Sequence, residues 1–471
     1  MEHHIIFAFV SPVTDRSVAS PVHYDDLAGA PYDAVQTNES AIICKERELE
    51  AEGSALERIF LLVSNDVKTG LAPSNEFGAG VTHIEFLEKR LLAACPALCG
   101  RIERIDYESD AKELERGMKS IAGLSEVVRR YVDAHAQEDT EETAATYIAH
   151  ADLTGGYRHA SIMMISILQM LSFYGIEQGD ILYSDQTAGR LYHATPILQL
   201  AKLMSGMDEF VRYGSVDSLE SYFETRQGDY SDELFHLIDA MHTFSDAIRV
   251  CATGQILGTV KTLGERLHTF HNHTGKCIEE QLFDTCTDIL REDYGPLLEP
   301  EVSRLDIIDW CGKHRFWQQQ LTLSTEWLPE YLVDHHLCYP GRKDVIALCQ
   351  SDRHAKYRSW KHIFLTDYHR HFKTSPPRIS NAKRQRLMEG ATGGWRGTLG
   401  GYLTLYQTGE LDTRLRLTEL IDVLHGYFEI REERNRLNHA NSDETLEIQE
   451  LSDGIGVYLR ILRNLAKGIP S

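Results

Sequence analysis

The stretch YIAHADLTGGYR, residues 147–158, joins a short apolar run to a glycine-rich turn. The turn leads directly into the helical pattern of residues 160–174. A strand that passes through a tight turn into a helix is the repeating unit of a parallel sheet covered by helices. This stretch therefore predicts an α/β fold for the N-terminal part of the chain.

The first third of the chain repeats this alternation. Continuous apolar runs at residues 5–10 and 58–64 are typical of strands buried on both faces, whereas residues 102–107 alternate like an outer strand. Helical periodicity appears at residues 36–57 (in part), 82–94 and 112–134, and further strands are expected at residues 181–183 and 191–194. We expect a doubly wound, mostly parallel sheet with helices on both faces.

Strand signals fade after about residue 198, and helical periodicity dominates from there. Two long helices are predicted at residues 413–440 and 444–466. Leu417 and Leu437 are expected on the inward face of the first, and Ser442 or Asp443 is expected to cap the second. The predicted fold class is thus α/β plus all-α.

The composition is that of an ordinary globular protein, with 471 residues, 42% hydrophobic and 25% charged. The opening MEHHIIFAFV is too short to span a membrane and lacks a basic start and a small-residue cleavage site. We expect a cytoplasmic protein that does not bind membranes. Nine scattered cysteines without a C-x-x-C pair favour reduced thiols, and a metal site at His268, His271 and His273 is the weaker reading of that histidine cluster.

A net charge of -23 argues against a protein that coats nucleic acid through a broad basic surface. One local segment differs, because residues 353–386 carry ten Lys and Arg against the single acid Asp367, with aromatic residues interleaved. This pattern suits a phosphate backbone and stacked bases. The alternative is a basic strip that balances acids on a neighbouring domain.

The sequence RNRLNH, residues 434–439, lies in a predicted helix. Arg434, Asn435, Asn438 and His439 share one flank there, because residues three and four apart are neighbours. An imidazole can move a proton near neutral pH, and a guanidinium can stabilise charge on a phosphate. The spacing alone is common and recurs at Arg16/His23, Arg130/His135 and Arg266/His271, but those copies lack the adjacent amide, and His23 follows Pro21 in a stretch that we expect to be a loop. The alternative is a solvated helix face.

Two loops follow predicted strands at what should be the same edge of the sheet, where such folds bind ligands. Ser11 and Pro12 follow the first strand, and residues 152–158 follow the strand at 147–151. Thr154 offers a hydroxyl, and Gly155 and Gly156 allow the backbone to approach a ligand closely. Arg158 can bind a phosphate through its guanidinium. The loop is neither a Walker motif nor G-x-G-x-x-G, and a plain tight turn is the alternative to a nucleotide site.

A strand that ends in Asp-x-Thr-x-Gly and opens a helix resembles the signature loop of the CARF domains of CRISPR-associated proteins. The segments GMDEF (206–210), YGS (213–215) and LSTEWLPEY (323–331) resemble connector and effector segments of the same group. Residues 434–439 match its HEPN motif, arginine-polar-x-x-x-histidine. The chain thus resembles a type III CRISPR accessory ribonuclease of the Csm/Csx CARF–HEPN group. It departs at Gly155, where many relatives carry histidine or proline.

The resemblance implies a Rossmann-like CARF domain at residues 1–200, a helical connector at 201–300 and a HEPN domain at 301–471. It implies a homodimer that binds cyclic tetra- or hexa-adenylate as an allosteric activator and cleaves single-stranded RNA without a metal or other cofactor, leaving 2′,3′-cyclic phosphate and 5′-hydroxyl ends. The implied catalytic residues are Arg434, Asn435 and His439. The implied ligand residues are Ser11, Pro12, Asp152, Thr154, Gly155, Gly156 and, from the reading of the loop itself, Arg158.

Three other readings stay open. The chain could be a non-catalytic nucleotide sensor whose helical half docks a partner. It could be a ring nuclease, in which the loop at residues 152–158 opens the cyclic ligand and Thr154 positions the attacking hydroxyl. A CARF-gated DNA nuclease is the third, and it would need a carboxylate–lysine metal site.

Overall fold

The computed structural model describes residues 2–74, 76–107, 114–136, 146–156, 159–224, 228–367, 395–438 and 448–468. Arg158, His439, the predicted cap Ser442/Asp443 and residues 368–386 of the basic segment lie outside them. Two compact units are present, Met1–Leu200 and Ala201–Ser471. Each unit is described by itself below.

The first unit is built on a six-stranded sheet with the order β5-β4-β1-β6-β7-β8. The strands are β1 (Glu2–Phe9), β4 (Leu56–Val63), β5 (Ile102–Asp106), β6 (Thr146–Asp152), β7 (Glu177–Asp185) and β8 (Arg190–His193). All neighbouring pairs are parallel except β7 and β8, which form an antiparallel hairpin. The predicted mostly parallel sheet is therefore confirmed, with the 102–107 strand at one edge.

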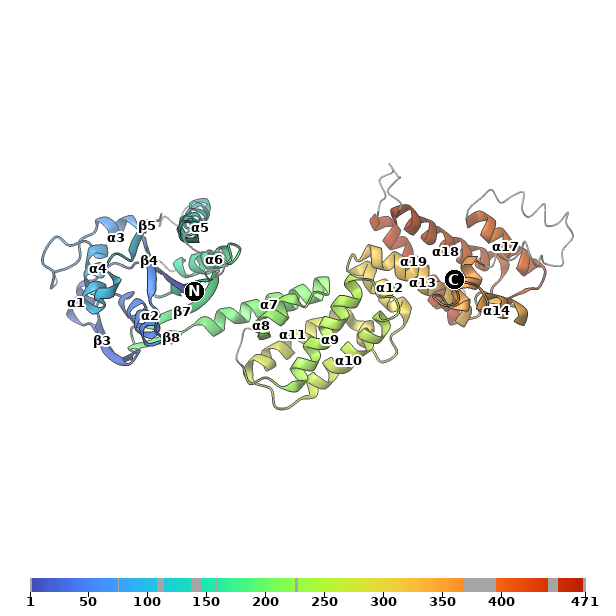
Figure 1. Ribbon diagram of the computed structural model, residues 1–471, viewed down its shortest axis with the longest axis horizontal. Helices are drawn as coiled ribbons and strands as arrows, with labels where there is room; N and C mark the ends of the chain where they lie inside the picture. The colour runs from blue at the N-terminus through green and yellow to red at the C-terminus, as the bar shows by residue number, and fades with distance from the viewer. Residues whose placement is uncertain are drawn as a thin grey trace. The chain divides into compact units, whose positions relative to one another are not determined.

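Helices cover both faces of this sheet, as predicted (Figure 1). One face packs on α2 (Glu39–Ala51) and α4 (His83–Ala94), and the other on α5 (Leu114–Ala136) and α6 (Ala160–Ser172). Along β1, Ile6 and Ala8 enter the first core while Ile5 and Phe7 enter the second. A strand buried on both faces has to be apolar at every position, which explains the continuous run.

One local expectation for the first unit is wrong. The sequence predicts a loop around His23, after Pro21. The structure instead has a hairpin there, formed by β2 (Val22–Leu27) and β3 (Ala30–Ala34). Only Tyr24 and Leu27 of β2 are buried, so the strand shows little apolar alternation. The shorter elements of this unit are α1 (Asp15–Ala19), α3 (Asn65–Thr69) and η1 (Pro96–Leu98).

The second unit is helical, and its helices follow the predicted periodicity (Figure 1). α7 (Thr195–Tyr213) contains the boundary between the units in the sequence. The others are α8 (Asp217–Glu224), α9 (Asp232–Arg249), α10 (Ile256–Asn272), α11 (Ile278–Tyr294), η2 (Gly295–Leu298), α12 (Arg304–Lys313), α13 (Trp317–Asp334), α14 (Lys343–Gln350), α15 (Trp360–Asp367), α17 (Trp395–Gln407), α18 (Leu417–Asn438) and α19 (Ile448–Ala466), with the short pair β9 (Tyr339–Pro340) and β10 (Leu411–Asp412).

Helix α13 is central to the second unit, since it packs against α12, α15 and α18. Its backbone is tied to α18 by the Tyr427 hydroxyl, which donates to the carbonyl of Thr325 at 3.2 Å. On α18, Leu420, Leu424 and Phe428 are buried as expected, but Leu417 and Leu437 are each 37% exposed. Those two expectations are wrong, because both residues lie at the ends of the helix, beyond the packed centre.

Candidate functional site

The loops after β1 and β6 meet at the carboxyl edge of the sheet in the first unit. These strands are hydrogen-bonded neighbours, with Ala8 paired to Asp152, so their following residues emerge side by side. The Gly156 amide donates to Oγ of Ser11 at 2.9 Å, which joins the two loops directly. Pro12 is exposed on the first loop. The structure thus brings together the predicted residues Ser11, Asp152, Thr154 and Gly156.

The polar groups of the second loop are largely engaged by the protein itself. Oδ1 of Asp152 accepts from the Thr154 amide at 2.8 Å, and Oγ1 of Thr154 accepts from the Ser184 amide at 2.8 Å. These bonds fix the turn and pin it to β7. The side chain of Asp152 is only 1% exposed, so it shapes the loop from below instead of pointing into solvent.

Both glycines of the loop are required by its conformation. Gly155 is buried, and a Cβ atom there would overlap the carbonyl oxygen of Phe9 and the side-chain amide of Asn38. Gly156 has a φ of +81°, a region that side chains rarely adopt. The sequence predicted that the backbone at these glycines lies close to a ligand. At Gly155, the backbone instead lies close to the end of the first strand, β1.

Sequence reasoning missed Asn38, which is fully buried beside these loops at the start of α2. Its Nδ2 donates to Oδ2 of Asp152 at 2.6 Å and to the Phe9 carbonyl at 3.0 Å. Its Oδ1 accepts from the Ser11 amide at 3.2 Å. An Asn before a helix is typical of an N-cap, yet this side chain makes no capping hydrogen bond. The sequence pattern therefore predicts a helix cap and not the contacts with the two loops.

Burial raises the pKa of Asp152 to about 6, although hydrogen bonds from Thr154 and Asn38 oppose the rise. The folded protein therefore disfavours the ionised form, and the stability this carboxyl contributes at acid pH is lost as the pH rises through about 6. We expect the unfolding free energy of the first unit to increase by about 1 kcal/mol between pH 7 and pH 5 from this group. An Asp152→Asn variant should lack that part of the pH dependence.

Hydrogen exchange of β1 and β6 amides at pH 5, 6 and 7, corrected for intrinsic exchange rates, measures this effect. The five tryptophans all lie in the second unit, so their fluorescence does not report on the first. An equal pH slope in the parent and in Asp152→Asn would contradict the assignment to Asp152.

The second candidate site lies on α18 of the helical unit. Arg434 and Asn435 are both partly buried, and Nη1 of Arg434 lies 3.4 Å from Oδ1 of Asn435 in a long hydrogen bond. Nε of Arg434 is buried and has no partner among the described residues. His439, the third predicted catalytic residue, follows the last described residue of this helix.

Other polar side chains surround this part of α18. Burial raises the pKa of the Cys251 thiol, and the positive charge of Arg434 opposes that rise, which places Arg434 within electrostatic range of the turn between α9 and α10. Glu326 of α13 also acts on Cys251. The charge of Arg434 thus acts on the α9–α10 turn, and α13 packs against α18.

A second histidine, His362 of α15, lies within electrostatic range of Arg431 on α18. Burial lowers its pKa; Glu326 opposes the shift, and the charges of Arg358 and Arg431 add to it. Nδ1 of His362 lies 3.8 Å from Oε2 of Glu326. The sequence placed His362 only in the basic segment, because nothing in its local pattern links α15 to α18. In that segment, Lys361 forms an ion pair with Asp334 of α13.

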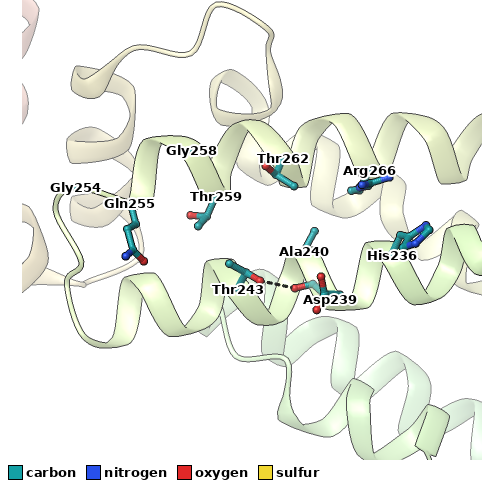
Figure 2. A pocket seen from close by; sticks show the side chains of 10 residues that line it. All are labelled: His236, Asp239, Ala240, Thr243, Gly254, Gln255, Gly258, Thr259, Thr262 and Arg266. Atoms are coloured by element: carbon teal, nitrogen blue, oxygen red, sulfur yellow. Dashed lines mark hydrogen bonds between the residues drawn. The ribbon is translucent and has the colours of Figure 1, made fainter.

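A groove of about 460 Å³ lies elsewhere in the second unit, between α9 and α10 (Figure 2). Its lining residues are His236, Asp239, Ala240, Thr243, Gly254, Gln255, Gly258, Thr259, Thr262 and Arg266. None of the predicted site residues lines it. Among the described residues there is no group of three or more His, Cys, Asp or Glu side chains placed to hold a metal ion. No described helix is long and apolar enough to cross a membrane.

The fold and these two sites define an α/β unit with a polar strand-end site, followed by a helical unit with an arginine–amide site. No family model and no curated protein match the chain. Among solved structures, it is similar to "Enterococcus italicus Csm6 bound to cyclic hexa-2'-fluoro-hexa-dAMP", with a TM-score of 0.39 and 8% identity over 99% of this chain and 94% of that one. Similarity at this level assigns no role to any residue.

Proposed function

We propose that the chain is a cyclic-oligoadenylate-activated endoribonuclease of the CARF–HEPN type, which acts as a homodimer on single-stranded RNA. The single observation that carries the proposal furthest is the joining of the Ser11 and Gly156 loops at the carboxyl edge of a parallel sheet. That edge is where open α/β folds bind ligands. The motif resemblance at residues 152–156 and 434–439 supplies the identity of ligand and reaction.

In the first unit, the proposed ligand site is formed by Ser11, Pro12, Thr154, Gly156 and Arg158. Asp152 and Gly155 contribute by shaping the loop, because one is buried and the other packs on Phe9. Backbone amides near the start of α6 suit the phosphates of a nucleotide ring. The proposed division of the second unit is a connector at residues 201–300 and a ribonuclease domain at 301–471.

In the second unit, the RNA 2′-hydroxyl attacks the adjacent phosphorus and the bond to the 5′-oxygen of the next nucleotide breaks. His439 assists the proton transfers, and Arg434 stabilises the negative charge that gathers on the phosphorane. Asn435 holds the guanidinium on one side, in line with its contact to Nη1. The products carry a 2′,3′-cyclic phosphate and a 5′-hydroxyl.

Incubation of the full chain with single-stranded RNA, cyclic hexa- or tetra-adenylate and excess EDTA tests this chemistry. We expect cleavage to continue at an undiminished rate, with 2′,3′-cyclic phosphate ends, because the proposed charge stabilisation comes from Arg434. Loss of cleavage in EDTA with recovery on adding Mg²⁺ would count against the proposed mechanism and favour a metal-dependent nuclease.

A further inference from the structure

We propose that Asn38 is a positioning residue that clamps the two ligand loops of the first unit together through its side-chain amide. The inference rests on the proposed function, because that function identifies the ligand that the two loops bind. Asn38 itself is fully buried and touches both loops from beneath, so it acts through Ser11 and Asp152 and not on the ligand.

All the hydrogen-bonding groups of the Asn38 amide point to the strand ends. Its oxygen accepts from the Ser11 amide, and its nitrogen donates to the Asp152 carboxylate and to the Phe9 carbonyl. Among side-chain groups, a primary amide is the one that can donate two hydrogen bonds and also accept. One planar group therefore ties the loop after β1 to the loop after β6.

The contact to Asp152 extends the clamp to the rest of the second loop. The other oxygen of the same carboxylate accepts from the Thr154 amide at 2.8 Å, and the Thr154 hydroxyl is held by Ser184. The groups that act on the ionisation of Asp152 are Thr154 and Asn38, both through hydrogen bonds. Removing the Asn38 amide leaves a buried carboxylate oxygen with one partner fewer.

The direct bond between Gly156 and Ser11 remains when Asn38 is changed, so the loops should loosen without separating. We expect Asn38→Ala to weaken the binding of fluorescently labelled cyclic hexa-adenylate to the full chain about tenfold, because part of the binding free energy must then order the loosened loops. Hydrogen exchange at Ser11 and Thr154 should quicken in the same variant.

Glu46→Ala is the matched control. Glu46 lies on the same helix, is 3% exposed and accepts a buried backbone bond from Leu56 at 2.8 Å, far along the helix from the loops. The Glu46→Ala variant removes this bond and the ion pair of Glu46 with Arg101 at 3.5 Å, so it deletes buried polar contacts away from the loops. It should leave ligand binding and the exchange of both loops within about twofold of the parent.

An exchange of side chains separates positioning from general destabilisation. Asn38→Asp alone places a carboxylate against Asp152, so binding should be weaker than in Asn38→Ala at pH 7.5 and should recover near pH 5.5, where the pair can share a proton. The double variant Asn38→Asp/Asp152→Asn restores an amide-to-carboxylate contact, but it replaces the bond to Phe9 with a carboxylate oxygen that lies against the Phe9 carbonyl oxygen. The single variant Asn38→Asp has this repulsion and the one against Asp152. The double variant should therefore bind more tightly at pH 7.5 than Asn38→Asp does.

Two results would overturn the clamp. One is unchanged hydrogen exchange at Ser11 and Thr154 in a folded Asn38→Ala protein. The other is a double variant that binds no better than Asn38→Asp. If the parent binds no cyclic oligoadenylate, the proposed function is wrong, and the exchange measurement alone then decides whether Asn38 holds the loops.

Discussion

Replacement of Arg434 with alanine is expected to slow RNA cleavage by roughly 10²–10³-fold, the usual cost of removing one group that stabilises charge in a transition state. Ligand binding by the first unit should be unchanged. The physical reason is that the Arg434 guanidinium has a buried Nε without a described partner and only a long contact to Asn435, so it is not committed to a structural ion pair among the described residues.

Arg436→Ala is the matched control on the same helix. Nη1 of Arg436 pairs with Oε1 of Glu433 at 2.8 Å, and two residues along a helix place it on a different flank from Arg434. Cleavage by this variant should stay within about threefold of the parent, because this partly exposed ion pair lies outside the proposed catalytic flank. Equal losses in both variants would point to a general effect of charge on RNA binding and would remove the special role of Arg434.

His439→Ala should lower the rate by a comparable or larger factor, about 10²–10⁴-fold. Because the two side chains are proposed to act on one transition state, the double variant should be little slower than the slower single variant. Rates are measured with activator at saturation and RNA in excess. Parent-like cleavage by His439→Ala would favour the non-catalytic sensor over the ribonuclease.

Gly155→Ala is expected to abolish the response to the activator and to destabilise the first unit by several kcal/mol. The added methyl group would overlap the Phe9 carbonyl and the Asn38 amide, and neither can retreat, because both are held at the end of β1. Cleavage at saturating cyclic hexa-adenylate should fall to the basal rate.

Gly123→Ala controls for the change from glycine to alanine in the same unit. Gly123 lies within α5, and a Cβ atom there meets nothing within 4 Å. This variant should be at least as stable as the parent, because alanine favours a helix by about 1 kcal/mol over glycine. A Gly155→Ala protein that still binds and responds to the activator would contradict the close packing of Gly155 against Phe9 and Asn38.

The sheet could be predicted because its strands are buried on both faces. Ile5 to Phe9 and Ile59 to Val63 leave no position for a polar side chain facing solvent, so the apolar runs are continuous. The β2–β3 hairpin was missed for the opposite reason, since exposed and partly buried side chains predominate in it and only Tyr24, Leu27 and Ala34 are fully buried. Apolar periodicity carries no signal for such a ribbon.

The position of the candidate ligand loop could be predicted from the sequence, but the residues that hold the loop in its conformation could not. The glycines and Asp152 stand together in the sequence, whereas Asn38 is 114 residues from Asp152 and resembles an ordinary helix cap. The contact between His362 and Glu326 was missed in the same way, because packing of α15 on α13 brings the two side chains together and no local pattern encodes it. Long-range contacts of single polar residues lie beyond what periodicity can predict.

In the proposed function, a nucleotide bound by the first unit controls strand scission by the second. The most direct measurement is the rate of single-stranded RNA cleavage by the full chain with and without saturating cyclic tetra- or hexa-adenylate, with binding followed in parallel. We expect the rate to rise roughly 5–150-fold with one of the two rings, the range of ordinary allosteric coupling. A ring that binds to the chain while the cleavage rate stays the same would contradict the proposed function.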